Sequence, residues 1–150
     1  MITFGVEPAH VVLTEGAALF ARHADEQVHS DLPLDIDHDR YLLADDLGIL
    51  RVFTVRDETR LIGYACFCVQ FSLRHKTSLQ ATEDSLYLAP EYRKGTTGVR
   101  FIKFIENVLS LEGVQLIRQH AHPDTTLDAL LPKMGYEHCH NEWERRLDKE

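Results

Sequence analysis

Features of several protein classes are missing from this sequence of 150 residues. No apolar run approaches the roughly 20 residues that a membrane-spanning helix requires. Residues 1–7 lack the basic start and the apolar stretch of a secretory signal. No segment is rich in proline, glycine or serine, and no stretch is repeated. We therefore expect a single cytoplasmic domain over residues 1–150 that binds no membrane.

Basic residues and cysteines are also scarce. Lysine and arginine total 16 against 24 aspartates and glutamates, which gives a net charge of -8. This balance argues against nucleic acid as a partner, because phosphate binding requires a basic surface, and it suits a cationic ligand. The three cysteines, Cys66, Cys68 and Cys139, lack the Cys-x-x-Cys spacing of a redox pair. We interpret all three as reduced thiols of the core, with Cys66 and Cys68 on one face of a strand.

Apolar periodicity predicts alternating strands and helices. Apolar and β-branched runs indicate strands over 2–6, 50–56, 61–71, 79–88, 114–121 and 136–147. Helical spacing indicates helices over 8–28, 40–47 and 124–134, and one that ends at 112. Asp124 is expected to cap the last helix, and glycines to end three of them: Gly48, Gly113 and Gly135. This order, with a hairpin around 57–60, predicts an α/β or α+β fold whose mixed sheet is covered on both faces.

The stretch 86–100 is the most informative part of the chain, because it joins an expected strand to a helix through a loop with Gly95 and Gly98. The first amides of a helix have no partner within it, and the helix dipole adds positive charge there. Basic and hydroxyl side chains surround the glycines: Arg93, Lys94, Arg100, Thr96 and Thr97. The pattern predicts a pyrophosphate site, although a plain turn that needs glycine would look the same.

Motifs for other cofactors are absent. The loop matches neither the P-loop nor the Gly-x-Gly-x-x-Gly spacing of dinucleotide-binding folds. Residues 35–39 resemble the start of a calcium loop, but Arg40 stands where glycine is required. Four histidines come in two His-x-His pairs, a spacing that is not typical of zinc sites: His120, His122, His138 and His140. We therefore predict no metal.

The stretch 86–100 resembles the coenzyme A motif of the GNAT acetyltransferases, often written Arg/Gln-x-x-Gly-x-Gly/Ala. Leu88–Arg93 is similar to the family's hydrophobic-x-Pro-x-Tyr-Arg lead-in. Arg93 and Gly98 stand at the first and last motif positions, whereas Thr96 replaces the usual central glycine, with Gly95 beside it. The version Tyr92–Gly98 is most similar to members encoded by phages and prophages.

Two further segments resemble the same family, so that the similarity covers nearly the whole chain. Residues 57–65 resemble its second and third strands, and residues 127–136 its later helix. The resemblance implies a GNAT-like, mostly antiparallel mixed sheet flanked by helices on both faces. It also implies transfer of an acetyl group from acetyl-CoA to a primary amine, either a cationic small molecule or a protein lysine or N-terminus. A homodimer is left open.

The resemblance also implies which residues bind the cofactor. Backbone amides of residues 94–98 would hold the pyrophosphate of coenzyme A. The edge of the strand 85–88 would pair with the pantetheine arm, as in β-augmentation, and an amide near Leu86 or Tyr87 would polarise the thioester carbonyl. The expected cofactor-binding residues are Leu86, Tyr87, Leu88, Arg93, Lys94, Gly95, Thr96, Thr97 and Gly98.

The general acid and base are harder to assign. Leu131 stands where many members have the acidic tyrosine, and it cannot donate a proton. Asp84 and Glu83 are candidate bases, and strand alternation allows at most one of them to face the cleft. His122 is a third candidate and would share a strand face with His120. Each of these residues could instead be a surface or hydrogen-bonded residue, and a GNAT-fold binding or regulatory module without catalysis is the alternative function.

Overall fold

The computed structural model describes residues 1–27 and 32–149. They fall into two compact units, residues 1–119 and 120–150, each described here by itself. The first contains most of the secondary structure, in the following order: β1 (Ile2–Val6), α1 (Ala9–Glu15), α2 (Ala17–Asp25), α3 (His38–Asp46), β2 (Leu50–Asp57), β3 (Arg60–Phe71), β4 (Leu79–Leu88), η1 (Pro90–Tyr92), α4 (Thr97–Leu111) and β5 (Leu116–Arg118).

The strands form one five-stranded sheet in the order β1-β2-β3-β4-β5. The first four strands are antiparallel neighbours, and β5 runs parallel to β4. The hairpin predicted around 57–60 is confirmed, because Asp57 pairs with Arg60 across a two-residue turn. β3 is buried along most of its length, as its nearly continuous apolar sequence predicts for a central strand.

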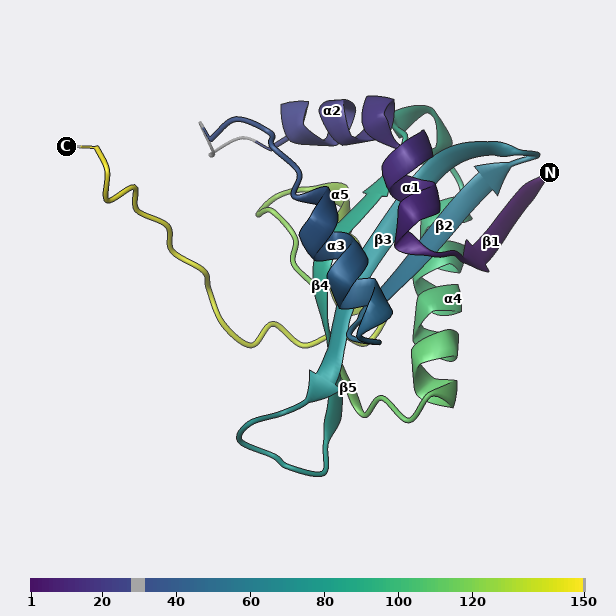
Figure 1. Cartoon of the computed structure of the whole chain (residues 1–150). Helices are drawn as coiled ribbons and strands as arrows, with labels where there is room; N and C mark the ends of the chain where they lie inside the picture. The colour runs from purple at the N-terminus through teal and green to yellow at the C-terminus, as the bar shows by residue number, and fades with distance from the viewer. Residues whose placement is uncertain (28–31, 150) are drawn as a thin grey trace. The chain divides into compact units, whose positions relative to one another are not determined.

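Helices cover both faces of this sheet, as predicted (Figure 1). On one face, Phe101, Ile105 and Leu109 of α4 pack against Phe53 and Phe67 of the sheet. On the other face, α1, α2 and α3 pack against residues of β2, β3 and β4. The predicted α/β class with a mixed, mostly antiparallel sheet is therefore confirmed.

The helix predicted over 8–28 is two helices, α1 and α2, with a break at Gly16. A Cβ at Gly16 would lie 2.6 Å from the Phe20 ring and from the Val12 carbonyl oxygen, so only glycine fits this close approach. α2 ends at Asp25, and Val28 lies outside the described residues. The helix predicted over 40–47 begins earlier, at His38, because Asp37 caps it by accepting a hydrogen bond from the Arg40 amide.

A β-bulge interrupts β4 in the middle of the sheet. Cys66 of β3 pairs with Ser85, and the next residue of β3, Phe67, pairs with Glu83, so Asp84 is the extra residue. A bulge breaks strict alternation and re-aims the side chains next to it. Asp84 and Ser85 consequently face the same side of the sheet, the side covered by α1–α3.

The C-terminal part differs most from the sequence-based expectation. The strand predicted over 114–121 is only β5, Leu116–Arg118. In the second unit, α5 (Thr126–Lys133) is capped by Thr125, which accepts a hydrogen bond from the Asp128 amide, and not by Asp124. The strand predicted over 136–147 is wrong, because these residues form no strand. The described residues of that unit, 120–149, contain no strand that could provide backbone hydrogen bonds to this segment.

The predictions made for the cysteines are confirmed only in part. Cys66 and Cys68 lie on the same side of the sheet, as predicted, but Cys139 is exposed and does not belong to the core. The glycines expected to end helices, Gly48, Gly113 and Gly135, have φ of 73°, 92° and 91°. None of the helices in residues 1–27 and 32–149 has the length and apolar character needed to cross a membrane.

Glu7 connects the start of α1 to β2 and makes acid stability testable. Its carboxylate accepts hydrogen bonds from Thr54 and from Arg56, the latter at 2.9 and 3.0 Å. These bonds from Arg56 lower the pKa of Glu7 in the folded state. A lowered pKa means that the interaction stabilises the fold above the unfolded value of about 4.3 and is lost as the pH falls below it.

We expect Glu7→Gln to destabilise the protein by about 1 kcal/mol at pH 7, since both partners are partly exposed and a charged hydrogen bond is lost. Urea unfolding at pH 7 and pH 3 measures the difference. At pH 3 the advantage of the wild type should be smaller than at pH 7, because the carboxylate becomes protonated as the pH falls through its lowered pKa. An advantage of equal size at both pH values would contradict the assigned role of the Glu7 charge.

Candidate functional site

The loop after β4 leads through η1 into the N-terminus of α4. Gly95 has φ 82°, a conformation that favours glycine. Thr96 precedes the helix with φ -104°, and its hydroxyl does not cap it. The amides of Thr97 and Gly98 belong to the first turn, where the helix provides no acceptor for them. The positive end of the dipole of a 15-residue helix is therefore at this loop.

The space beside Gly98 is not filled by the protein. A Cβ built on Gly98 would have Leu88 Cδ2 as its nearest neighbour, at 4.0 Å. Glycine is thus required here neither by packing nor by a positive φ. An anion could approach the amides of the first turn at this point.

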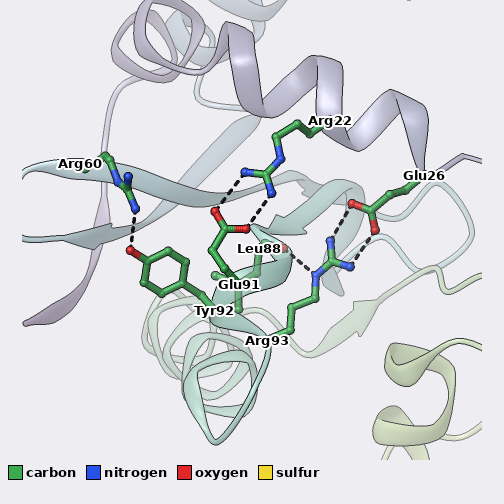
Figure 2. A network of polar contacts seen from close by, with 7 residues as sticks. All are labelled: Arg22, Glu26, Arg60, Leu88, Glu91, Tyr92 and Arg93. Carbon is green, nitrogen blue, oxygen red and sulfur yellow. Dashed lines mark hydrogen bonds and ion pairs between the residues drawn. The ribbon is translucent and has the colours of Figure 1, made fainter.

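Ion pairs and hydrogen bonds hold this loop against α2 and the β2–β3 hairpin (Figure 2). Glu91 accepts two hydrogen bonds from Arg22 of α2, at 2.7 and 3.2 Å. The same bonds lower the pKa of Glu91 to about 2. The Tyr92 hydroxyl donates to Asp57 at 2.7 Å and accepts from Arg60 at 2.7 Å. The loop is therefore fixed from two sides before any ligand arrives.

Arg93, the first residue of the loop motif, is engaged within the protein. Its guanidinium forms a bidentate pair with Glu26 at the end of α2, at 2.7 and 2.8 Å, and Nε donates to the Leu88 carbonyl (Figure 2). It also lies over the Tyr87 ring, 5.2 Å from the centroid. Of the other basic residues here, Lys94 is exposed and Arg100 lies over the Phe4 ring at 5.2 Å. Arg93 is therefore held by other parts of the protein, and the backbone amides and the exposed Lys94 are the groups that an anion could contact.

The second half of β4 has an unpaired edge. β5 pairs with β4 only at Gln80, Ala81 and Thr82. Beyond that point, within the described residues, β4 has β3 on one side and no strand on the other. The side chains of Leu86 and Leu88 pack in the core on the α4 side, so the backbone of this segment is what a ligand at the edge would meet.

A cavity of about 210 Å³ lies next to the bulge of β4, on the face covered by α1, α2 and α3. Its wall is largely apolar and includes Val12, Leu13, Phe20, Ile36 and Val52. The polar side chains that line it are the following: His23, Gln27, Tyr41, Tyr64, Asp84 and Ser85. An apolar pocket with a few convergent polar groups is the usual form of a small-molecule site.

Asp84 and Tyr41 are joined by a short hydrogen bond in this cavity. The Tyr41 hydroxyl donates to Asp84 Oδ2 at 2.5 Å. Burial first, and this bond second, raise the pKa of Tyr41 above its usual value. Tyr41 therefore stays protonated and holds one carboxylate oxygen. Asp84 remains accessible to solvent, and Oδ1 has no partner among the residues the structure describes.

His23 and Tyr64 are also in contact with each other in the cavity. His23 Nδ1 and the Tyr64 hydroxyl share a hydrogen bond of 2.7 Å, and the His23 ring stacks on Tyr87 with centroids 4.8 Å apart. Burial raises the pKa of Tyr64 and, in the same cavity, that of Cys66, with the nearby Asp84 charge adding to the latter. Cys66 thus remains a thiol and is unsuited as a nucleophile near neutral pH.

The other candidate catalytic residues lie elsewhere. Glu83 is buried and pairs with Phe67, which packs on the α4 side of the sheet, away from the cavity. His120 and His122 follow the end of β5, so no shared strand face relates them, which corrects that expectation. They belong to the second unit, where the His122 carbonyl accepts a hydrogen bond from Thr125. Asp31, an acidic residue that the sequence suggests as a contact for a cationic amine and not as a catalytic residue, lies outside the described residues.

Sequence reasoning missed His23, Tyr41 and Tyr64 as cavity residues. His23 follows Leu19 by four positions, so the apolar stripe of α2 could have indicated it. Tyr41 has no such local signal, because it meets Asp84 across 43 positions of sequence. No group of three or more potential metal ligands occurs within residues 1–27 and 32–149.

Comparisons with known proteins give a fold but no close relative. No protein-family model matches the sequence, and no curated protein does. Among solved structures, a predicted acetyltransferase from Clostridium acetobutylicum with acetyl-CoA is 14% identical, with a TM-score of 0.75 over 98% of this chain and 97% of that one.

Two further structures have stated acceptors. A ribosomal-protein-alanine N-acetyltransferase from Brucella melitensis biovar Abortus 2308 is 13% identical, with a TM-score of 0.72 over 98% of this chain and 99% of that one. An aminoglycoside acetyltransferase from an uncultured soil metagenomic sample, in complex with sisomicin, is 11% identical, with a TM-score of 0.74 over 97% and 96%. At these identities the chain shares the fold of known acetyltransferases.

Proposed function

We propose that this protein is an acyl-CoA-dependent N-acyltransferase of the GNAT superfamily, which transfers an acetyl group from acetyl-CoA to a primary amine. The observation that carries the proposal is the adjacency of three features along β4. These are the cavity with Asp84, the unpaired strand edge and the amide-rich start of α4. The narrower similarity to phage and prophage proteins depends on Tyr92–Gly98 alone and stays a prediction.

The residues around the loop fit coenzyme A. Amides of residues 94–98 would hold the pyrophosphate, and the open space at Gly98 admits it. The backbone of β4 beyond the bulge would pair with the pantetheine arm, with an amide near Leu86 or Tyr87 directed at the thioester carbonyl. Acetyl-CoA supplies the activated acyl group. The pairs Arg93–Glu26 and Arg22–Glu91 would keep the loop in place without contacting the reacting atoms.

Asp84 is the residue best placed to handle the amine proton. Its free oxygen can accept a proton from an ammonium group in the cavity, while Tyr41 fixes the other oxygen. The amine nitrogen then bonds to the acyl carbon, the C–S bond breaks and sulfur keeps the electron pair. Of the two protons that the ammonium loses, one ends on the thiol and the other in solvent.

Leu131 is the residue that favours a second candidate function. A leucine stands where the resemblance leads us to expect the tyrosine that would protonate the thiolate. A GNAT-fold binding or regulatory module that lacks catalysis would also have no need of that hydroxyl. Such a module could still bind acetyl-CoA, so binding alone does not separate the two functions.

A thermal-shift measurement with acetyl-CoA, followed by an assay of coenzyme A release with a panel of amines, tests the proposal. At a concentration 100 times the dissociation constant, acetyl-CoA should stabilise the fold by about 2.7 kcal/mol. Stabilisation with amine-dependent release of coenzyme A supports the enzyme. Stabilisation without release by any amine favours the binding module, and no stabilisation contradicts both cofactor-using functions.

A further inference from the structure

The dimensions of the cavity limit what can bind in it. Its volume is about 210 Å³. For comparison, an apolar cavity of about 150 Å³ accommodates benzene. The cavity beside β4 therefore has room for one aromatic ring and a short chain. Because the cavity is partly open, an aminoglycoside with several sugar rings could place only part of one ring system in it, and most of the molecule would remain outside.

The wall chemistry suits an apolar, ring-bearing ligand. Phe20 of α2 packs edge-on against Tyr64, with ring centroids 5.0 Å apart and an angle of 84° between the planes. Val12 of α1 and Val52 of β2 extend the apolar wall, and both are buried. The Tyr64 hydroxyl is engaged by His23, so it does not offer this wall a free polar group. An aromatic ring would gain apolar burial and edge-to-face contacts here.

The charge of the cavity suits a single cation. Among the described residues, Asp84 is the one carboxylate that lines it, and none of the lysines or arginines there does so. Tyr41 holds Asp84 Oδ2 at 2.5 Å, which leaves Oδ1 for one ammonium group. A polyamine or an aminoglycoside would bring further cations against an apolar wall on which the described residues offer no second carboxylate to pair them, at a large desolvation cost.

We propose that the acceptor is a compact primary monoamine with an aromatic body, whose ammonium pairs with Asp84 and whose ring lies among Val12, Phe20 and Tyr64. This inference depends on the proposed acyl transfer and adds the class of its substrate. It separates this chain from two proteins of similar structure, an aminoglycoside acetyltransferase and a ribosomal-protein-alanine N-acetyltransferase.

The test is a comparison of four amines with the full-length protein and acetyl-CoA: 2-phenylethylamine, putrescine, sisomicin and an alanine-terminated peptide. We expect kcat/KM for 2-phenylethylamine to exceed each of the others at least tenfold. The neutral analogue 2-phenylethanol has the same ring without the charge. It should compete with 2-phenylethylamine, but with an affinity at least tenfold weaker, because Asp84 would lack its partner.

Two variants on α2 test whether the aromatic ring of the amine binds in this cavity. Ala24 lines the cavity and is half-buried, whereas Ala21 on the same helix is exposed and lines no part of it. Ala24→Leu should raise KM for 2-phenylethylamine at least tenfold by filling the cavity, while the thermal shift with acetyl-CoA is kept. Ala21→Leu makes the same change on the same helix and should alter neither quantity.

The outcomes distinguish an error in the substrate class from an error in the proposed acyl transfer. Higher kcat/KM with putrescine, sisomicin or the peptide would overturn the substrate class and leave the acyl transfer intact. Stabilisation by acetyl-CoA, with 2-phenylethylamine neither binding nor reacting, would overturn the substrate class as well. No stabilisation by acetyl-CoA and no reaction with any amine would overturn the proposed function, and the substrate class with it.

Discussion

Gly98→Trp will abolish the stabilisation of this protein by acetyl-CoA, whereas its stability without ligand will change little. The reason is the open space at Gly98, where an added Cβ meets no protein atom closer than 4.0 Å. An indole ring in that space would cover the first-turn amides of α4 that we expect to hold the pyrophosphate. Thermal unfolding with and without acetyl-CoA measures both effects in one experiment.

Gly98→Ala is the matched control. The motif that this loop resembles has glycine or alanine at its last position, and alanine favours a helix over glycine by up to about 1 kcal/mol. We therefore expect this variant to keep the acetyl-CoA shift and to be as stable as the wild type or slightly more so. If Gly98→Trp folds and still shows the wild-type shift, the cofactor does not bind at this loop and the site assignment is wrong.

Asp84→Asn is expected to lower kcat/KM by about 10²- to 10³-fold, within the range that general bases contribute. Asparagine has nearly the same shape and can still accept the hydrogen bond from Tyr41, so the cavity should be preserved. What is lost is the charge that would pair with the ammonium and receive its proton. Steady-state kinetics with the best amine of the panel measure the loss.

The acetyl-CoA thermal shift of Asp84→Asn serves as the internal control. Because Asp84 lies in the cavity and not in the α4 loop, the shift should equal that of the wild type. Full activity of Asp84→Asn would remove Asp84 from the mechanism. If Glu83→Gln lost activity instead, the base would have to be assigned to Glu83, in spite of its position on the α4 side of the sheet.

Local sequence signals predicted the strands β2, β3 and β4 well, because each has a long apolar or alternating run between turn residues. The same logic failed over 136–147, where strand-like residues such as Tyr136 and Trp143 have no neighbouring strand in their unit. A strand needs a partner for its backbone hydrogen bonds, and propensity alone does not provide one.

The candidate site shows the same difference between local features, which the sequence reveals, and contacts between distant residues, which it does not. The loop from Arg93 to Gly98 could be found from the sequence, because its glycines and helix start are local in the chain. The engagement of Arg93 by Glu26 could not, since it joins residues 67 positions apart. Alternation allowed only one of Glu83 and Asp84 to face the cleft, but it did not indicate which one.

By itself, the sequence determined the fold class, the positions of β2, β3 and β4 along the chain and the position of the amide-rich loop. Each of these depends on interactions between residues close in the chain, such as apolar periodicity, turns and helix ends. Only the tertiary structure decided that Asp84 meets Tyr41 and that a cavity of about 210 Å³ lies beside them. The bulge at Asp84 and the packing of α1–α3 create that cavity, and both depend on pairings between distant segments that no local pattern encodes.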